Sequence, residues 1–235
     1  MANPHQKSLT NRTLASNVSA ILRRPGLLEI AFTLGRIKVT GAMLFQVAQA
    51  VDSGRIKCWT ANEFKSRGRG ETVGNSLIEA KYRSKPNAMV FLRENYGSTP
   101  SEEQTIVHES VHAALDLSTS GKLTTLSVDD EAAATLASAF YIILCKRAVG
   151  GFALGGGGHA EALELAEQAL KFPGNFAVKD GMFYFTEFDV ASLKQAVAAS
   201  RGFNKFIGDD GLPTDNSAAV YIYEGVALCG KTGCH

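Results

Sequence analysis

Residues 99–117 read TPSEEQTIVHESVHAALDL and carry the clearest structural signal in the chain. Thr99 and Glu102 have the spacing of a capping box, in which two side chains satisfy free N–H groups at the start of a helix. Pro100 suits the first helical position, because its fixed backbone angle is already helical and its missing N–H is not needed there. The sequence therefore predicts a helix from about Pro100 to Leu117.

Within this helix the chain reads His108-Glu109-Ser110-Val111-His112. Helix positions four apart differ by about 40° around the axis, so both imidazoles point the same way and can hold one metal ion. Glu109 lies on the adjoining face, where it can contact a water at the metal without being a ligand. Chance gives this pattern about 0.006 times in a chain of this composition, so the spacing is informative.

A catalytic zinc normally has three protein ligands, so the two histidines need a partner. Asp129, Asp130 and Glu131 follow in the first turn of a helix that we predict over residues 127–147. Glu131 is the candidate third ligand, with Asp130 and Asp129 as substitutes. Asp116, one turn beyond the second histidine, is a candidate for orienting a ligand histidine.

Residues 88–147, a strand followed by the motif helix and the glutamate helix, resemble the gluzincin branch of the zincin metallopeptidases. In that family a second helix donates a glutamate at about this separation from the motif. The resemblance implies that His108, His112 and Glu131 bind Zn²⁺ and that Glu109 is the general base.

Two details separate the chain from other branches of the family. Thr135 stands where thermolysin-like members carry an aspartate, four residues after the ligand glutamate. Leu115 and Ser118 stand where the metzincins carry a glycine and a third histidine.

The resemblance implies a zinc-dependent peptidase that acts on a peptide or protein substrate. Zinc would activate a water, and Glu109 would take its proton and return it to the leaving amine. A further donor is needed for the oxyanion, and Tyr223, His159 and Tyr141 are the candidates. In zincins a sheet-edge strand aligns extended peptides, and the strand predicted over residues 88–94 is similarly placed.

Hydrophobic periodicity and turn residues predict the remaining elements. Before the motif we expect helices over 17–24, 27–34 and 41–51, a mobile basic loop over 64–75, and a hairpin of strands 76–83 and 88–94. After residue 147 we expect a glycine-rich connection over 150–158, a helix over 160–171, a strand pair over 177–185, a helix over 190–200, and a β-rich tail with a strand at 220–223. These elements predict an α+β fold, a predominantly helical single domain with a small antiparallel sheet beside the motif helix, as in zincins.

The chain has 235 residues, 45% of them hydrophobic and 20% charged, with a net charge of +1. This composition is that of an ordinary globular protein. Charge is unevenly placed, with 11 Lys/Arg against 4 Asp/Glu in residues 1–75 and 13 against 19 in residues 76–235. We therefore expect a basic helical N-terminal segment, residues 1–75, packed on or preceding a zincin-like core, residues 76–235. A basic excess is more often a solvated face, so no nucleic-acid partner is predicted.

The sequence shows no export or membrane signal. Residues 1–7 lack the features of a Sec signal peptide, and the longest apolar run, residues 132–145, is too short to span a bilayer. We expect a cytoplasmic location by default, with delivery as a secreted effector as the alternative, because bacterial effectors include metallopeptidase domains of this kind. Reduced thiols are expected, although Cys229 and Cys234 fit either a small disulfide loop or part of a metal site.

The sequence also raises functions other than that of a peptidase. Residues 225–232, GVALCGKT, match the phosphate-binding P-loop, but three residues after this segment leave no room for the helix that the loop requires, so no nucleotide binding is predicted. Two alternatives stay open: a non-catalytic interaction or regulatory protein on a zincin-like scaffold, and a zinc hydrolase of a non-peptide amide. The oligomeric state is not predicted.

Overall fold

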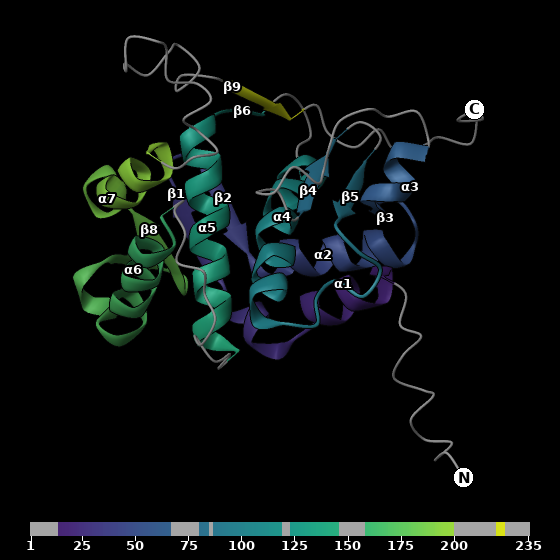
Figure 1. Ribbon diagram of the computed structural model, residues 1–235. Helices are drawn as coiled ribbons and strands as arrows, with labels where there is room; N and C mark the ends of the chain where they lie inside the picture. The colour runs from purple at the N-terminus through teal and green to yellow at the C-terminus, as the bar shows by residue number, and fades with distance from the viewer. Residues whose placement is uncertain are drawn as a thin grey trace.

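The computed structural model describes residues 14–66, 80–84, 87–118, 123–145, 158–199 and 220–223. The fold is mixed α/β with helices predominating, as expected (Figure 1). The first half contains α1 (Leu14–Leu22), a 3₁₀ helix (Pro25–Glu29), β1 (Ala31–Leu34), β2 (Ile37–Thr40), α2 (Gly41–Asp52), β3 (Lys57–Thr60), α3 (Ala61–Ser66), β4 (Ala80–Arg83), β5 (Ala88–Phe91) and α4 (Pro100–Ser118). The second half contains β6 (Leu123–Leu126), α5 (Ser127–Leu144), α6 (His159–Lys171), a 3₁₀ helix (Pro173–Asn175), β7 (Ala177–Lys179), β8 (Met182–Phe185), α7 (Glu187–Ala198) and β9 (Val220–Tyr223).

The motif helix, α4, packs beside α5 at the centre of the molecule (Figure 1). Its predicted start is confirmed. The backbone N–H of Glu102 donates to Thr99 Oγ1 at 3.3 Å, and the backbone N–H of Thr99 donates to Glu102 Oε2 at 3.1 Å, which completes the capping box. Pro100 occupies the first helical position.

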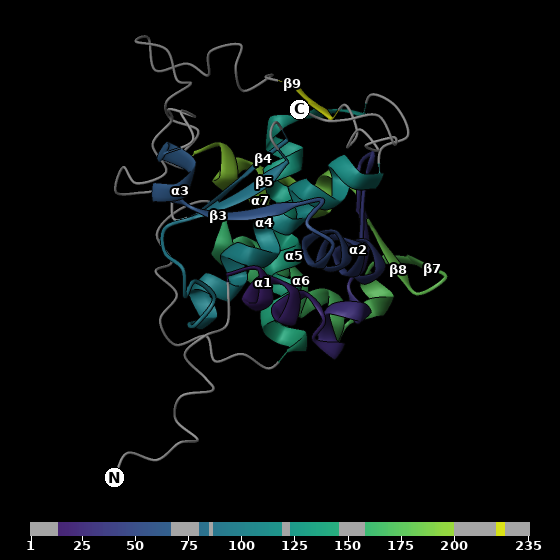
Figure 2. The same ribbon diagram turned by 90° about the vertical axis from the view of Figure 1, so that its right-hand side faces the viewer.

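A three-stranded sheet in the order β3-β5-β4 lies beside α4 (Figure 2). The predicted hairpin is present, since β4 pairs antiparallel with β5. The prediction of a purely antiparallel sheet is wrong, because β3 joins the other edge of β5 in parallel. A parallel pairing needs a long connection between the two strands, and a local hydrophobic pattern does not report it.

A second sheet, in the order β2-β1-β8-β7, was not foreseen from the sequence. The helix predicted over residues 27–34 is wrong, because the chain forms a 3₁₀ helix and then β1. Phe32 and Leu34 of β1 are buried on one face, while β1 pairs antiparallel with β2 and parallel with β8. The hydrogen bonds of these pairings stabilise an extended backbone, whereas a short apolar run by itself fits either a helix or a strand.

The other local predictions have mixed outcomes. The helices α2 and α6 and the β7–β8 pair are confirmed, and helices close to the predicted ranges are present as α1 and α7. The loop predicted over 64–75 is wrong at its start, because residues 64–66 complete α3, where Phe64 is buried. The strand at 220–223 is present and pairs with β6. Residues 67–79, 146–157, 200–219 and 224–235, including the predicted domain boundary, glycine-rich connection and cysteine tail, lie outside the described residues.

Residues from both sides of position 75 share one hydrophobic core. The Phe32 ring stacks on Phe140 of α5 at 5.6 Å between centroids and meets Phe185 of β8 edge-on at 6.0 Å. The strand β3 likewise pairs with β5. The first 75 residues therefore supply strands and core side chains to the part of the chain that carries the motif.

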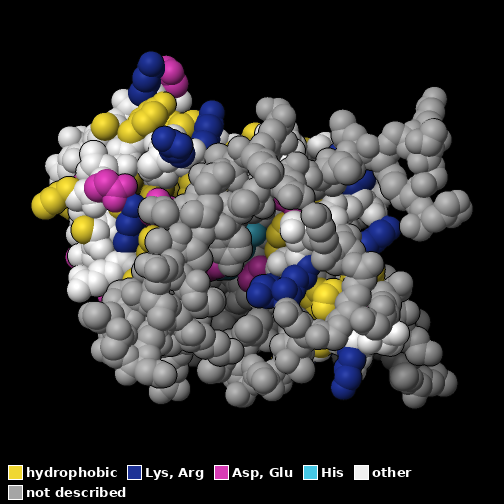
Figure 3. Space-filling view, turned by 90° about the horizontal axis from the view of Figure 1, so that it is seen from above, with side chains coloured by type: hydrophobic (Ala, Val, Ile, Leu, Met, Phe, Trp, Pro, Cys, Tyr) yellow, Lys and Arg dark blue, Asp and Glu magenta, His cyan; other side chains and the backbone are white. Residues whose placement is uncertain are grey.

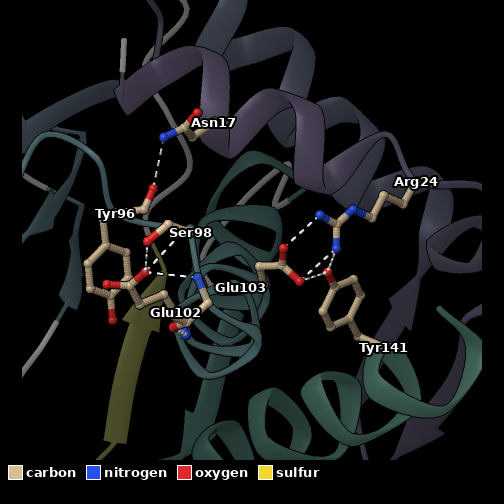
Figure 4. Close-up of polar contacts among 8 residues, drawn as sticks. Asn17, Arg24, Tyr96, Ser98, Glu102, Glu103 and Tyr141 are labelled. Carbon is tan, nitrogen blue, oxygen red and sulfur yellow. Dashed lines mark hydrogen bonds and ion pairs between the residues drawn. The ribbon is translucent and has the colours of Figure 1, made fainter. Parts of the chain in front are cut away.

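A partly buried polar cluster ties the segment that follows α1 to α4 and α5 (Figure 4). The Arg24 guanidinium donates to both Glu103 carboxylate oxygens at 2.7 Å, and the Tyr141 hydroxyl donates to Glu103 Oε2 at 2.8 Å. This bidentate arrangement fixes the first turn of α4 against its neighbours. In the part of the chain that the structure describes, every helix is too short or too polar to cross a membrane.

Candidate metal centre

The two motif histidines point the same way from α4, as the helical spacing predicts. His108 Nε2 lies 3.4 Å from His112 Nε2, and the rings stand at 70° to each other. Both side chains are partly exposed, at 18% for His108 and 12% for His112, so an ion can reach them.

Glu131, in the first turns of α5, completes a group of three donors. Its Oε2 lies 3.1 Å from His108 Nε2, and its Oε1 lies 3.6 Å from His112 Nε2. Ligand atoms that surround zinc tetrahedrally at about 2.0–2.1 Å are about 3.3 Å apart. The separation of the two nitrogens, and that of each nitrogen from its nearer Glu131 oxygen, are close to this value, and with one ligand atom from each residue all three lie within 4.8 Å of one another. Among the described residues this is the group that could hold a metal.

The three consecutive acids at the start of α5 have three different partners. Asp129 Oδ1 forms an ion pair with Lys194 Nζ of α7 at 2.7 Å, Asp130 Oδ2 lies 2.9 Å from His112 Nδ1, and Glu131 faces both histidines. Successive helix residues differ by about 100° around the axis, so neighbouring side chains leave in different directions. Of the three acids considered as ligands, the structure brings Glu131 to the Nε2 atoms of both histidines, whereas Asp130 meets the opposite nitrogen of His112 and Asp129 pairs with Lys194.

Asp130 has the orienting role that the sequence suggested for Asp116. Its carboxylate is fully buried and accepts the Nδ1 proton of His112, so Nε2 is the ring nitrogen that faces the donor group. Asp116 instead accepts from the Tyr82 hydroxyl at 2.7 Å. The orienting carboxylate thus comes directly before Glu131 in the sequence.

Opposite charges dominate the electrostatics of the metal-free site. Burial favours neutral His112, but Asp130 and Glu131 outweigh it and raise the pKa of His112 to about 10. Burial likewise favours neutral Glu131, but His112 and His108 outweigh it and lower the pKa of Glu131 to about 2. At neutral pH the metal-free site therefore holds a protonated His112 against two carboxylates, and a metal must displace that proton.

Glu109 lies beside the donor group without belonging to it. Its Oε2 accepts a hydrogen bond of 2.6 Å from the backbone N–H of Tyr82 in β4. Burial raises the pKa of Glu109, although His108 and His112 act in the opposite direction. A carboxylate of raised pKa at the side of a metal centre suits a group that takes up and releases a proton.

The edge strand beside α4 is β4, so the prediction that residues 88–94 form the edge is wrong. β5 lies between β3 and β4. The backbone N–H of Lys57 in β3 donates to the Asn87 carbonyl, so Asn87 and Met89 face β3, while Ala88 and Val90 face β4. In the paired register, the N–H and C=O groups of Tyr82 then point away from β5, toward the metal centre.

No protein-family model, curated protein or solved structure matches this chain. Function is therefore inferred from the geometry of the metal centre.

The three candidates for an oxyanion donor have different positions. Tyr141 is buried and donates to Glu103, so it is not available to a substrate. His159, at the start of α6, has its Nδ1 3.3 Å from Gln104 Nε2, and burial together with His108 lowers the pKa of His159 to about 4. His159 is thus a neutral imidazole near the centre, whereas the side chain of Tyr223 lies outside the described residues.

Two residues that contact the site, Gln104 and Tyr82, are absent from the sequence predictions. Gln104 lies one turn before His108 on the same face of α4, and this spacing could have identified it. Tyr82 lies in a strand, and nothing in its local pattern links it to Glu109. On the face seen in Figure 3, a histidine and acidic side chains reach the surface within a hollow, with Lys or Arg side chains beside it.

Proposed function

We propose that this protein is a zinc-dependent metallopeptidase of the zincin type. The observation that carries the proposal is the convergence of His108, His112 and Glu131, with donor atoms 3.1–3.6 Å apart. The adjacent Glu109 is left outside the donor group, in the position of a general base. The combination of a three-donor group and a separate carboxylate is what metal-assisted hydrolysis requires.

Zinc is the metal that this donor set fits best. Two imidazole nitrogens and one carboxylate form a His₂Glu set, which is typical of catalytic zinc. When bound, zinc lowers the pKa of water and polarises a carbonyl group. Asp130 keeps His112 in the tautomer that offers Nε2 to the metal.

Glu109 supplies the proton transfers. Its carboxylate accepts a proton from the attacking water and then gives that proton to the amine that leaves when the peptide bond breaks. Burial raises the pKa of Glu109, which makes its carboxylate a better proton acceptor than an exposed one. The three side chains of the donor group cannot transfer this proton, because they would be bound to the metal.

The edge of β4 supports a peptide as the substrate. The Glu109 carboxylate occupies the Tyr82 N–H, but the Tyr82 C=O points outward beside Glu109, so an extended chain that pairs with this C=O would bring a peptide bond to the centre. We therefore assign an extended segment of a peptide or protein as the substrate class.

Zinc analysis and a peptide library test the proposal. We expect about one zinc per chain in the purified wild type and in Glu109→Gln, and cleavage of a mixed peptide library by the wild type alone. Glu164→Gln, at an exposed position of α6, is the matched control and should cleave like the wild type. Zinc-loaded wild type that cleaves no more than Glu109→Gln would contradict a peptidase, and zinc-free protein would remove the metal centre itself.

A further inference from the structure

We propose that Tyr82 is a positioning residue for Glu109. Its backbone N–H binds the Glu109 carboxylate, and its phenol fixes β4 to the far end of the same helix. This inference rests on the proposed function, because that is where Glu109 receives its role as general base.

The backbone contact orients the carboxylate. Tyr82 N–H points away from β5, and its acceptor is Glu109 Oε2 at 2.6 Å. A carboxylate with one oxygen held in this way cannot rotate freely about its last bond. The other oxygen, Oε1, is then the one that faces proton transfer.

The phenol contact fixes the strand. The Tyr82 side chain is 8% exposed, and its hydroxyl lies 2.7 Å from Oδ2 of Asp116, which is 1% exposed. The same hydroxyl lies 2.8 Å from Oδ1 of Asn87 in the hairpin turn. Asn87 is itself held, since its Nδ2 donates to the Arg55 carbonyl at 2.6 Å. The one hydroxyl proton serves two acceptor oxygens, of which the Asp116 carboxylate is the nearer, so the phenol links β4 to α4 beside the turn between β4 and β5.

The two contacts together prevent β4 from sliding along α4. Glu109 and Asp116 are seven positions apart, which is about 10.5 Å along a helix and nearly the same face. One strand residue thus reaches two points of the helix, with its backbone at the first and its side chain at the second. Loss of the phenol contact leaves the bond to Glu109 as the hydrogen bond between Tyr82 and α4, so this part of β4 and the Glu109 carboxylate gain freedom together.

Tyr141 provides a matched control for Tyr82. It is also a buried tyrosine whose hydroxyl donates to a buried carboxylate of α4, in this case Glu103 (Figure 4). Tyr82→Phe and Tyr141→Phe each remove one buried hydroxyl, so both lose stability. Only the first removes a contact with the strand that holds Glu109.

Amide hydrogen exchange in the metal-free protein tests these two contacts of Tyr82, here called the clamp, without any activity measurement. In the wild type we expect the amide at position 82 to be protected as strongly as the sheet-bonded amides of Lys81 and Arg83. Glu109→Ala and Tyr82→Phe should each accelerate exchange at position 82 by about tenfold or more, while Tyr141→Phe leaves it unchanged. An amide at position 82 that exchanges freely in the wild type would overturn the proposal.

Kinetics on a peptide that the wild type cleaves give the second readout. Tyr82→Phe should lower kcat about tenfold with KM and bound zinc unchanged, because the general base is misplaced and the ligands are not. Asp116→Asn, which can still accept from the phenol, should retain more activity than Asp116→Ala. Equal kcat for Tyr82→Phe and Tyr141→Phe would overturn the positioning role. A protected amide at position 82 in a wild type that cleaves no peptide would support the clamp and contradict the peptidase.

Discussion

His112 Nδ1 lies 2.9 Å from Asp130 Oδ2, and the Asp130 carboxylate is fully buried. The contact fixes which nitrogen of His112 carries the proton and which faces the metal. Outer carboxylates of this kind orient a ligand histidine and increase its basicity. Asp130 is therefore as much a part of the metal centre as the three donors, although it touches no metal.

Asp130→Ala should weaken zinc binding by about 10–100-fold. The substitution leaves His112 Nδ1 without its acceptor and removes a negative charge beside the metal. Competition with a chromophoric zinc chelator measures the change. Asp129→Ala is the control, since Asp129 pairs with Lys194 rather than with a histidine. Equal loss of zinc affinity in both variants would show that Asp130 stabilises the first turn of α5 and does not orient His112.

Zinc affinity should rise with pH across the neutral range. The pKa of His112 is about 10 in the metal-free site, so His112 is protonated at pH 7 and its proton must leave when the metal binds. We expect the apparent association constant to increase about tenfold per pH unit between pH 6 and 8 for this proton. Calorimetry in two buffers of different ionisation enthalpy counts the released protons. Affinity that does not change over this range would show that His112 is already neutral.

The metal-free protein should lose stability on the alkaline side as well. The folded pKa of His112, about 10, exceeds the value of about 6.5 in an unfolded chain. The contribution of His112 to the free energy of unfolding is thus fully present below pH 6.5 and is lost as pH rises to 10. Glu131 behaves in the opposite way, because its folded pKa of about 2 lies below its ordinary value of 4.5, so its contribution is lost as pH falls from 4.5 to 2.

Stability of the metal-free protein should therefore be greatest between pH 4.5 and 6.5 as far as this pair is concerned. Because the pKa of His112 is about 10 in the folded chain and about 6.5 in the unfolded chain, we expect the free energy of unfolding to fall by on the order of 5 kcal/mol from pH 6.5 to 10. Urea unfolding in the presence of a chelator measures it. Asp130→Ala should show a shallower decline, because part of the cause of the raised pKa of His112 is removed. An identical decline in both proteins would assign it to other groups.

The parts of the site that obey a helical period could be predicted from the sequence. His108 and His112 lie four positions apart on a well-capped helix, so their common direction follows from local geometry. Asp130 could not be assigned its role in this way. Which of three consecutive acids faces the histidines depends on the rotation of α5 about its own axis, and that rotation is fixed by packing against α4, α6 and α7.

The parts of the fold that depend on distant pairing could not be predicted. Residues 27–34 form a short apolar run, which fits a helix or a buried strand equally well. The strand is selected because β1 pairs with β8, about 150 positions later in the chain. Tyr82 was missed for the same reason, since its partners Glu109 and Asp116 lie in another element.

A fragment that begins at residue 76 should fail to fold and to bind zinc. It lacks β3, which pairs with β5, and β1, which pairs with β8, so each remaining sheet exposes an unpaired edge. It also lacks Phe32, whose ring packs between Phe140 and Phe185.

Circular dichroism, cooperative unfolding and zinc content compare this fragment with the full chain. Because the missing strands pair with strands of the fragment, residues 1–75 expressed together with it should restore structure and zinc binding. A fragment that unfolds cooperatively and binds one zinc on its own would show that the shared core is not required, and that the basic segment is an addition to an independent metal-binding domain.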